Sequence, residues 1–183
     1  MRIIGGEYRG RKIIFPDSEL VRPTKDRIRQ AVFNMLSDNV QGARVIDLFS
    51  GSGAYGLEAV SRGAETADFV DNNKEAIETI HSNIKHLGVQ SKTQVIEGDV
   101  FKIIEQLSRE EKKYNFLFAD PPYKQNMAKK LLNTQILSDI LTRSSLLVFE
   151  HSAEEVIFDN SSYYTLIRQK SYNNIKISIF IKP

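Results

Sequence analysis

The 183-residue chain contains no cysteine and no tryptophan, and it has only three histidines. Without cysteine it forms neither disulfides nor thiolate metal sites, which is typical of proteins in a reducing compartment. No apolar run is long enough to span a bilayer, and residues 1–6 lack the apolar core of a signal peptide. We therefore expect a soluble, cytoplasmic protein that needs no membrane partner.

Other common catalytic patterns are also missing. His81 and His86 are five positions apart on one predicted helix, so they do not share a face as metal ligands would. Ser52 lacks the G-x-S-x-G frame of a hydrolase nucleophile, because Ser50 stands at the first glycine position, and there is no P-loop lysine. The sequence predicts neither a metal cofactor nor a covalent serine mechanism.

Charge is small overall but unevenly distributed. The net charge is +2, whereas residues 1–30 hold eight Lys and Arg against four Asp and Glu, which gives +4 there and −2 for the rest. A basic arm before a near-neutral body suggests contacts with nucleic-acid phosphates, although a solvated charged surface would look the same. The candidate RNA-binding residues are Arg9, Arg11, Lys12, Arg22, Lys25 and Arg29.

Hydrophobic periodicity predicts an α/β fold in one domain. Strands and helices alternate from residue 43 onward, which is typical of a doubly wound parallel sheet covered on both faces. A small basic N-terminal hairpin extension (residues 1–22) precedes a Rossmann-like core (residues 23–183), and two antiparallel strands end the chain. The predicted strands are 44–48, 66–70, 93–96, 114–119, 145–150, 163–170 and 175–181, and the helices are 24–36, 54–61, 74–87, 100–107 and 127–141.

The tetrapeptide Asp120-Pro121-Pro122-Tyr123 follows the apolar run 114–119. Proline cannot extend a strand and holds the residue before it extended, so the run ends in a stiff corner. This corner presents a carboxylate, the Pro121 carbonyl and an aromatic ring. Such groups can hold a flat amino-bearing ring by its two N–H bonds and its face, although a strand ended by proline with a surface tyrosine would have the same sequence.

Acidic residues recur at one place in the predicted sheet. Asp47, Asp71, Asp99 and Asp120 all stand at the carboxyl ends of predicted strands. Doubly wound sheets bind ligands at that edge, so the recurrence predicts a binding site there. Taken alone, Asp99 is better explained as a helix cap.

The loop after the first strand reads Gly51-Ser52-Gly53-Ala54-Tyr55-Gly56, and Asp71 follows about twenty residues later. Taken by itself, this is the fingerprint of a dinucleotide site, with an acid gripping the ribose hydroxyls. A carboxylate at Asp47, just before the loop, would lie near a pyrophosphate. A ligand with a cationic centre and no phosphate, such as S-adenosylmethionine, suits this acidic neighbourhood better.

Together these motifs resemble a known family. The segment Asp47-Leu48-Phe49-Ser50-Gly51-Ser52-Gly53 resembles the first motif of class I S-adenosylmethionine-dependent methyltransferases, and Asp120-Pro121-Pro122-Tyr123 resembles the signature of their amino-methylating branch. Residues 1–11, 22–29 with Phe33-Asn34, 56–59 and 61–64 are similar to the RsmD family, over essentially the whole chain. That family methylates N2 of one guanine in bacterial 16S ribosomal RNA.

The resemblance implies a role for each motif. The methionine portion of S-adenosylmethionine would lie on the loop 47–53, which includes Asp47, Phe49, Ser50, Gly51 and Gly53. The ribose would lie on Asp71 with Asn72, and the adenine on Asp99 with Val100. Asp120, which would also lie beside the cofactor, and the Pro121 carbonyl would hold the guanine amino group. Pro122 would stiffen the corner, and Tyr123 would stack on the base.

Other targets stay open at this point. The same tetrapeptide could hold adenine in DNA or a glutamine side chain in a protein, and a non-catalytic RNA-binding module is a further alternative. The basic arm favours nucleic acid, and the resemblance implies 16S RNA, in naked form or in small-subunit particles, with S-adenosylhomocysteine as the product. Nothing in the sequence requires an oligomer.

Overall fold

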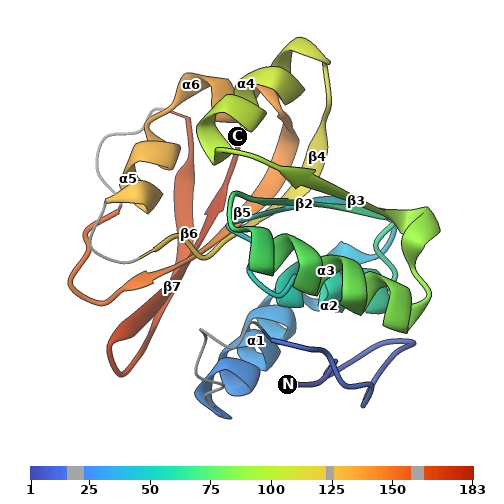
Figure 1. Ribbon diagram of the computed structural model, residues 1–183. Helices are drawn as coiled ribbons and strands as arrows, with labels where there is room; N and C mark the ends of the chain where they lie inside the picture. Colours follow the sequence, from blue (N-terminus) through green and yellow to red (C-terminus); the bar gives the residue numbers. More distant parts are fainter. Residues whose placement is uncertain (16–22, 123–125, 158–162) are drawn as a thin grey trace.

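The computed structural model describes residues 1–15, 23–122, 126–157 and 163–183 (Figure 1). Within them a seven-stranded sheet has the order β3-β2-β1-β4-β5-β7-β6. Strands β1 to β5 are parallel, whereas β7 is antiparallel to both of its neighbours. The strands are β1 (Arg44–Leu48), β2 (Thr66–Asp71), β3 (Thr93–Glu97), β4 (Tyr114–Ala119), β5 (Leu141–Ser152), β6 (Thr165–Tyr172) and β7 (Ile175–Ile181). The predicted α/β class and the antiparallel end of the sheet are confirmed.

Helices cover the sheet in two layers (Figure 1). The buried residues of the first three helices cluster on one face, and those of the last three cluster on the other. Short 3-10 turns lie at Ser37–Val40 and Gln90–Lys92. The helices are α1 (Pro23–Leu36), α2 (Ala54–Ser61), α3 (Lys74–Leu87), α4 (Val100–Arg109), α5 (Met127–Leu132) and α6 (Gln135–Asp139).

Strand β4 shows why its apolar run is continuous. Phe116 and Phe118 pack with the layer of α1, α2 and α3, whereas Leu117 and Ala119 pack with α4, α5 and α6. Successive side chains of a strand point to opposite faces, so a strand covered on both sides needs apolar residues at every position. All four are at most 4% exposed.

The predicted limits of the helices and strands were confirmed for some elements and wrong for others. Helix α3 has its predicted limits, because the Asn73 side chain accepts the Ala76 amide at its start and Gly88 adopts φ 74° at its end. The predicted helix 127–141 was wrong, since it breaks at Asn133 and Thr134 into α5 and α6. Two strands were also misplaced: β5 begins at Leu141, and β6 is shifted toward the C-terminus.

The N-terminal segment is joined closely to the core. The predicted hairpin consists of one antiparallel bridge between Arg2 and Lys12, and its apolar Ile3 and Ile13 are buried in the core of the α1 face. Helix α1 begins at Pro23, one residue before the predicted start of the helix 24–36. Proline suits the first turn of a helix because its missing N–H has no helical partner to lose.

Candidate active site

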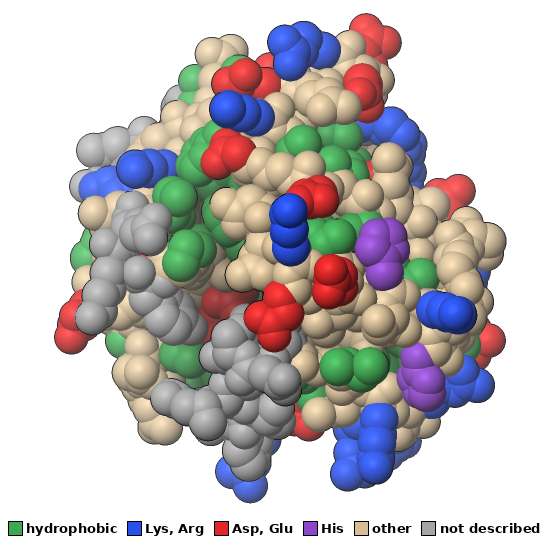
Figure 2. All heavy atoms as spheres, viewed as in Figure 1, with side chains coloured by type: hydrophobic (Ala, Val, Ile, Leu, Met, Phe, Trp, Pro, Cys, Tyr) green, Lys and Arg blue, Asp and Glu red, His purple; other side chains and the backbone are tan. Residues whose placement is uncertain are grey.

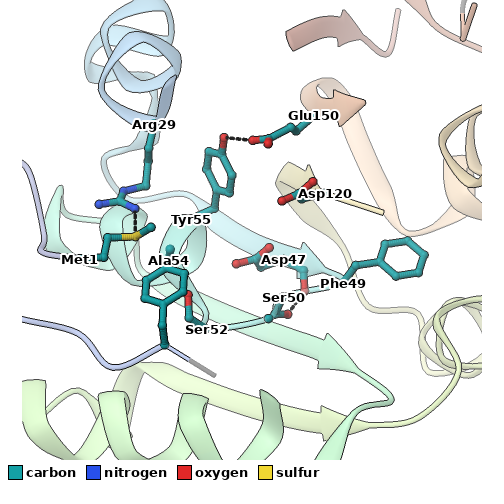
Figure 3. A pocket seen from close by; sticks show the side chains of 12 residues that line it. Met1, Arg29, Asp47, Phe49, Ser50, Ser52, Ala54, Tyr55, Asp120 and Glu150 are labelled. Carbon is teal, nitrogen blue, oxygen red and sulfur yellow. Dashed lines mark hydrogen bonds between the residues drawn. The ribbon is translucent and has the colours of Figure 1, made fainter. Parts of the chain in front are cut away.

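The carboxyl ends of the parallel strands meet around one hollow. Leu48 and Ala119 are paired in the β1–β4 register, so the residues after them begin the loops on neighbouring strands. The hollow has an empty volume of about 510 Å³, its open mouth included. Its walls combine the glycine loop, the first turn of α2, Asp120 and part of α1 (Figure 3). The lining residues are Met1, Phe15, Arg29, Asp47, Phe49, Ser50, Gly51, Ser52, Ala54, Tyr55, Asp120 and Glu150.

The glycine loop is held against two strands. The Ser50 hydroxyl donates to the Asp47 carbonyl at 2.5 Å and accepts the Val70 amide at 2.9 Å, which ties β1 to β2. Phe49 has φ 56°, a left-handed conformation that is strained for a residue with a side chain. A Cβ at Gly56 would lie 2.4 Å from the Phe69 ring, so only glycine lets α2 approach the sheet this closely.

Asp47 is the buried carboxyl of the site. Its side chain is 2% exposed, and Oδ2 accepts the Gly56 amide at 2.9 Å. Burial raises the pKa of Asp47 to about 8; the Gly56 hydrogen bond lowers it and the nearby Asp71 raises it further. A cation bound beside this group would favour its ionised form.

The residues predicted to hold the ribose and adenine lie at the neighbouring strand ends. Asp71 accepts the Gly51 amide with Oδ2 and the Asn73 amide with Oδ1, both at 2.9 Å, and Asn72 is exposed. Asp99 is exposed and accepts the Lys102 amide as the N-cap of α4. Val100 is buried in the opposite core. Asp71, Asn72, Asp99 and Val100 do not line the hollow, and Gly53 lies within the loop at φ 76°.

Asp120 and its prolines form the corner after β4. Asp120 is half-buried and lines the hollow, Pro121 is buried and Pro122 is exposed. In Figure 3 the Asp120 carboxylate points into the space between Asp47 and Tyr55. The predicted stacking residue Tyr123 lies outside the described residues.

Two residues that the sequence analysis did not select complete this wall. The Tyr55 hydroxyl donates to Oε2 of Glu150 at 3.0 Å (Figure 3), and the Tyr55 ring stacks on Phe118 with centroids 5.3 Å apart. Burial first, then the charges of Glu150 and Asp120, raise the pKa of Tyr55 well above its usual value. Glu150 follows an apolar run just as Asp120 does, and this signal could have identified it.

The predicted RNA-binding residues separate into two groups. Arg9, Arg11 and Lys12 are exposed, whereas Arg29 is 2% exposed. The Arg29 guanidinium is buried against Asp26 and Glu58 and donates to the Arg2 carbonyl, so it differs from the exposed basic residues. Arg22 lies outside the described residues, and so does the side chain of Lys25.

A second hollow lies beside this basic segment. Arg2 and Arg9 from the N-terminal segment and Arg27 from α1 line it, and all three are exposed. Asp26 lines this hollow and also contacts Arg29, which lines the first one. The ion pair of Arg29 with Asp26 therefore joins the lining of the first hollow to that of the second.

The arrangement can bind a cationic ligand next to a base. Asp47 and Asp120 place carboxylates around the first hollow, and on the face in Figure 2 several acidic side chains lie near the centre while most Lys and Arg side chains lie toward the periphery. Among the described residues, no three His, Asp or Glu side chains are grouped as metal ligands. No helix in the described part of the chain is both long and apolar enough to cross a membrane.

The strand order and this site define a Rossmann-like fold of the class I methyltransferase type. The structure titled "Putative methyltransferase yhhF from Escherichia coli" matches with a TM-score of 0.85 and 29% identity, over 100% of this chain and 97% of that one. Residues 1–181 match the family described as "Conserved hypothetical protein 95", the RsmD family, and the chain belongs to it.

Curated relatives span the same length. "Putative rRNA methyltransferase YlbH" of Bacillus subtilis is 33% identical over 182 residues, which cover 100% of this chain and 99% of the relative. "Ribosomal RNA small subunit methyltransferase D" of Escherichia coli K12 is 29% identical, over 98% of this chain and 89% of the relative. The predicted family is thus confirmed over the whole chain.

Proposed function

We propose that this chain transfers a methyl group from S-adenosylmethionine to the exocyclic N2 of a guanine in 16S ribosomal RNA. The observation that carries the proposal is the position of Asp120, which lines the same hollow as the glycine loop and the buried Asp47. Family membership and the names of its relatives support ribosomal RNA as the substrate.

The acidic side chains and the glycine loop of the first hollow fit S-adenosylmethionine better than a nicotinamide dinucleotide. Burial raises the pKa of Asp47 to about 8, and a cationic partner would favour the ionised carboxylate whereas a neighbouring pyrophosphate would disfavour it. We assign Asp47 and the loop residues Phe49, Ser50, Gly51 and Gly53 to the methionine portion. We assign the ribose to Asp71 and Asn72, and the adenine to Asp99 and Val100, at the adjoining strand ends.

When bound, S-adenosylmethionine would supply a methyl group on a sulfonium, and S-adenosylhomocysteine would be the product. Asp120 and the Pro121 carbonyl accept the two N–H bonds of the guanine amine, which aims its lone pair at the methyl carbon. Asp120 then takes the proton that N2 loses as the N–C bond forms and the C–S bond breaks. Pro122 keeps this corner rigid, and Tyr123 stacks on the base.

The exposed basic residues of the N-terminal segment are the proposed contacts with RNA. Arg9, Arg11 and Lys12 are exposed on the N-terminal segment beside the hollow lined by Arg2 and Arg27, where they can meet phosphates. A guanine within folded RNA must leave its stack to reach Asp120. We propose that small-subunit particles present it, and that one chain in the cytoplasm suffices as a single catalytic domain.

The test is transfer of labelled methyl to four acceptors in parallel: small subunits lacking the modification, protein-free 16S RNA, duplex DNA and a translation release factor. Digestion should locate the label at N2 of one guanine in a ribosomal sample. Asp120→Ala should lower turnover at least 100-fold, about 2.7 kcal/mol, while cofactor affinity measured by calorimetry stays unchanged.

Each other outcome contradicts a stated part of the proposal. Label only in DNA or in the release factor would replace the substrate and keep the chemistry. Cofactor binding without transfer to any acceptor would indicate a binding module. Turnover of Asp120→Ala within about tenfold of the parent would remove Asp120 from its role.

A further inference from the structure

Glu150 lies beside Asp120 at the same level of the sheet. Ala119 and Phe149 are paired in the parallel β4–β5 register, so Asp120 and Glu150 are the next residues on strands about 4.8 Å apart. Ala119 and Phe149 both pack with the α4, α5 and α6 layer. Because side chains alternate along a strand, Asp120 and Glu150 project toward the other layer, where the hollow lies.

The Glu150 carboxylate is buried and held in place. Its side chain is 4% exposed, and Oε2 accepts the Tyr55 hydroxyl at 3.0 Å. Tyr55 is itself fixed by stacking on Phe118. A carboxylate offers about four acceptor positions, and this hydrogen bond fixes the orientation of Glu150 at the wall of the hollow.

Its place in the strand order puts Glu150 on the substrate side of the site. The glycine loop follows β1, and Asp71 ends β2, on one side of β4. Glu150 belongs to β5, on the other side. A base whose amine meets Asp120 next to the cofactor loop would therefore extend toward Glu150.

We propose that Glu150 accepts the N1–H of the target guanine and thereby selects guanine over other purines; this rests on the proposed function. Guanine carries two donors side by side, N1–H and the 2-amino group, and two adjacent carboxylates match them. Adenine, 2-aminopurine and 2,6-diaminopurine present a lone pair at N1, which a carboxylate repels. Tyr55 is a positioning residue, because it acts through Glu150.

The test uses the site located by the transfer experiment. The target guanine in 16S RNA is replaced by ligation with 2-aminopurine or 2,6-diaminopurine. Both retain the 2-amino group, and both lack the N1–H and the O6 carbonyl of guanine. The Glu150→Gln comparison therefore has to assign the preference to N1. The parent should prefer guanine over both analogues by about 100-fold in kcat/KM.

Glu150→Gln should shift this preference. Its amide can donate to N1 of the analogues, so we expect guanine kcat/KM to fall about 30-fold, both analogues to gain, and the preference to drop at least tenfold. The matched control Glu105→Gln, at an exposed position of α4, should keep the parent's preference. Unchanged cofactor affinity and melting temperature would show that Glu150→Gln is folded.

The result separates the two proposals. If the parent methylates guanine N2 and Glu150→Gln keeps the same guanine-to-analogue ratio, Glu150 does not read N1 and only this inference is overturned. If the parent transfers no methyl to guanine N2, the proposed function fails first. A purely structural Glu150 would lower all three rates together, which would also overturn the inference.

Discussion

Nε of Arg29 lies 3.5 Å from Oε2 of Glu58, although the two side chains are only 2% and 0% exposed. The same carboxylate accepts the amides of Ile4 and Gly5 at 2.8 Å, and it pairs with Arg62 at 2.8 Å. Charges this deeply buried are tolerated only when they are paired and hydrogen-bonded. Glu58 therefore fastens the N-terminal segment to α1 and α2, beside the candidate active site.

Glu58→Gln should destabilise the protein by about 3 kcal/mol, because it removes the buried counter-charge of Arg29 and leaves that guanidinium, among the described residues, only Asp26, which is 36% exposed. Chemical denaturation measures this change, and hydrogen exchange at Ile4 and Gly5 should speed up before global unfolding. Glu65→Gln, on an exposed glutamate just beyond α2, is the control and should stay within about 0.5 kcal/mol of the parent. Equal stabilities of the two variants would contradict the role of Glu58.

Cofactor binding should depend on pH through Asp47. Its pKa is raised to about 8 by burial, so a cationic ligand must displace a proton to meet the ionised form. Affinity should rise about tenfold per pH unit between about pH 5.5 and 7, where the ligand's own amino group stays charged. Calorimetry in buffers of different ionisation enthalpy should detect the released proton. In Asp47→Asn the pH dependence of the affinity and the proton release should both vanish, and the affinity for the cofactor should fall.

The same substitution should stabilise the unliganded protein. Asp47 has a folded pKa of about 8 against about 4 in the unfolded chain, so folding binds a proton between these values and stability falls as pH rises through them. Asparagine does not ionise, so it removes this loss of stability at high pH, and its side-chain oxygen can still accept the Gly56 amide. Asp47→Asn should thus melt higher than the parent near pH 8, and a lower melting temperature there would contradict the raised pKa.

His151 should give the opposite pH dependence. It is fully buried; Nδ1 donates to the Ser152 carbonyl, and Nε2 lies 2.9 Å from the Ser178 hydroxyl, which can donate to it when the ring is neutral. Burial lowers the pKa of His151 from 6.5 to about 4. Between these values the unfolded state binds the proton, so stability is lost as pH falls, by up to about 3 kcal/mol.

The measurement is denaturant unfolding of the parent and His151→Gln at several pH values from about 7 to 4. The difference between the two curves isolates His151 from Asp47, whose slope has the other sign. A constant difference over this range would show that His151 does not titrate with folding.

Gly56→Ala should cost about 1–3 kcal/mol, because the new Cβ would lie 2.4 Å from the Phe69 ring. Thermal unfolding measures the loss. Phe69→Leu alone should also destabilise, but adding it to Gly56→Ala should recover part of the stability, since the aliphatic side chain leaves room for the methyl group. A double variant whose losses simply add would show that the two positions are not coupled.

Sequence signals from neighbouring residues explain which helices and strands could be predicted. Apolar patterns with periods of 2 and 3.6 residues predicted the observed limits of five elements, because those limits are set by residues close in the sequence. The five elements are β1, α2, α3, β4 and β7. Caps such as Asn73 and Gly88 reinforced them. The helix predicted across Asn133 was wrong because the chain breaks there, with Asn133 as the residue that ends α5 and Thr134 as the residue that precedes α6.

The sequence alone determined the alternation of strands and helices, the order of carboxylates at strand ends and, through its motifs, the family. Only the tertiary structure decided that Glu150 stands beside Asp120, and that the cation of Arg29 is buried against Glu58. These depend on the register of strands β4 and β5 and on the packing of α1 against Glu58. Both are contacts between residues far apart in the chain, and no local pattern encodes them.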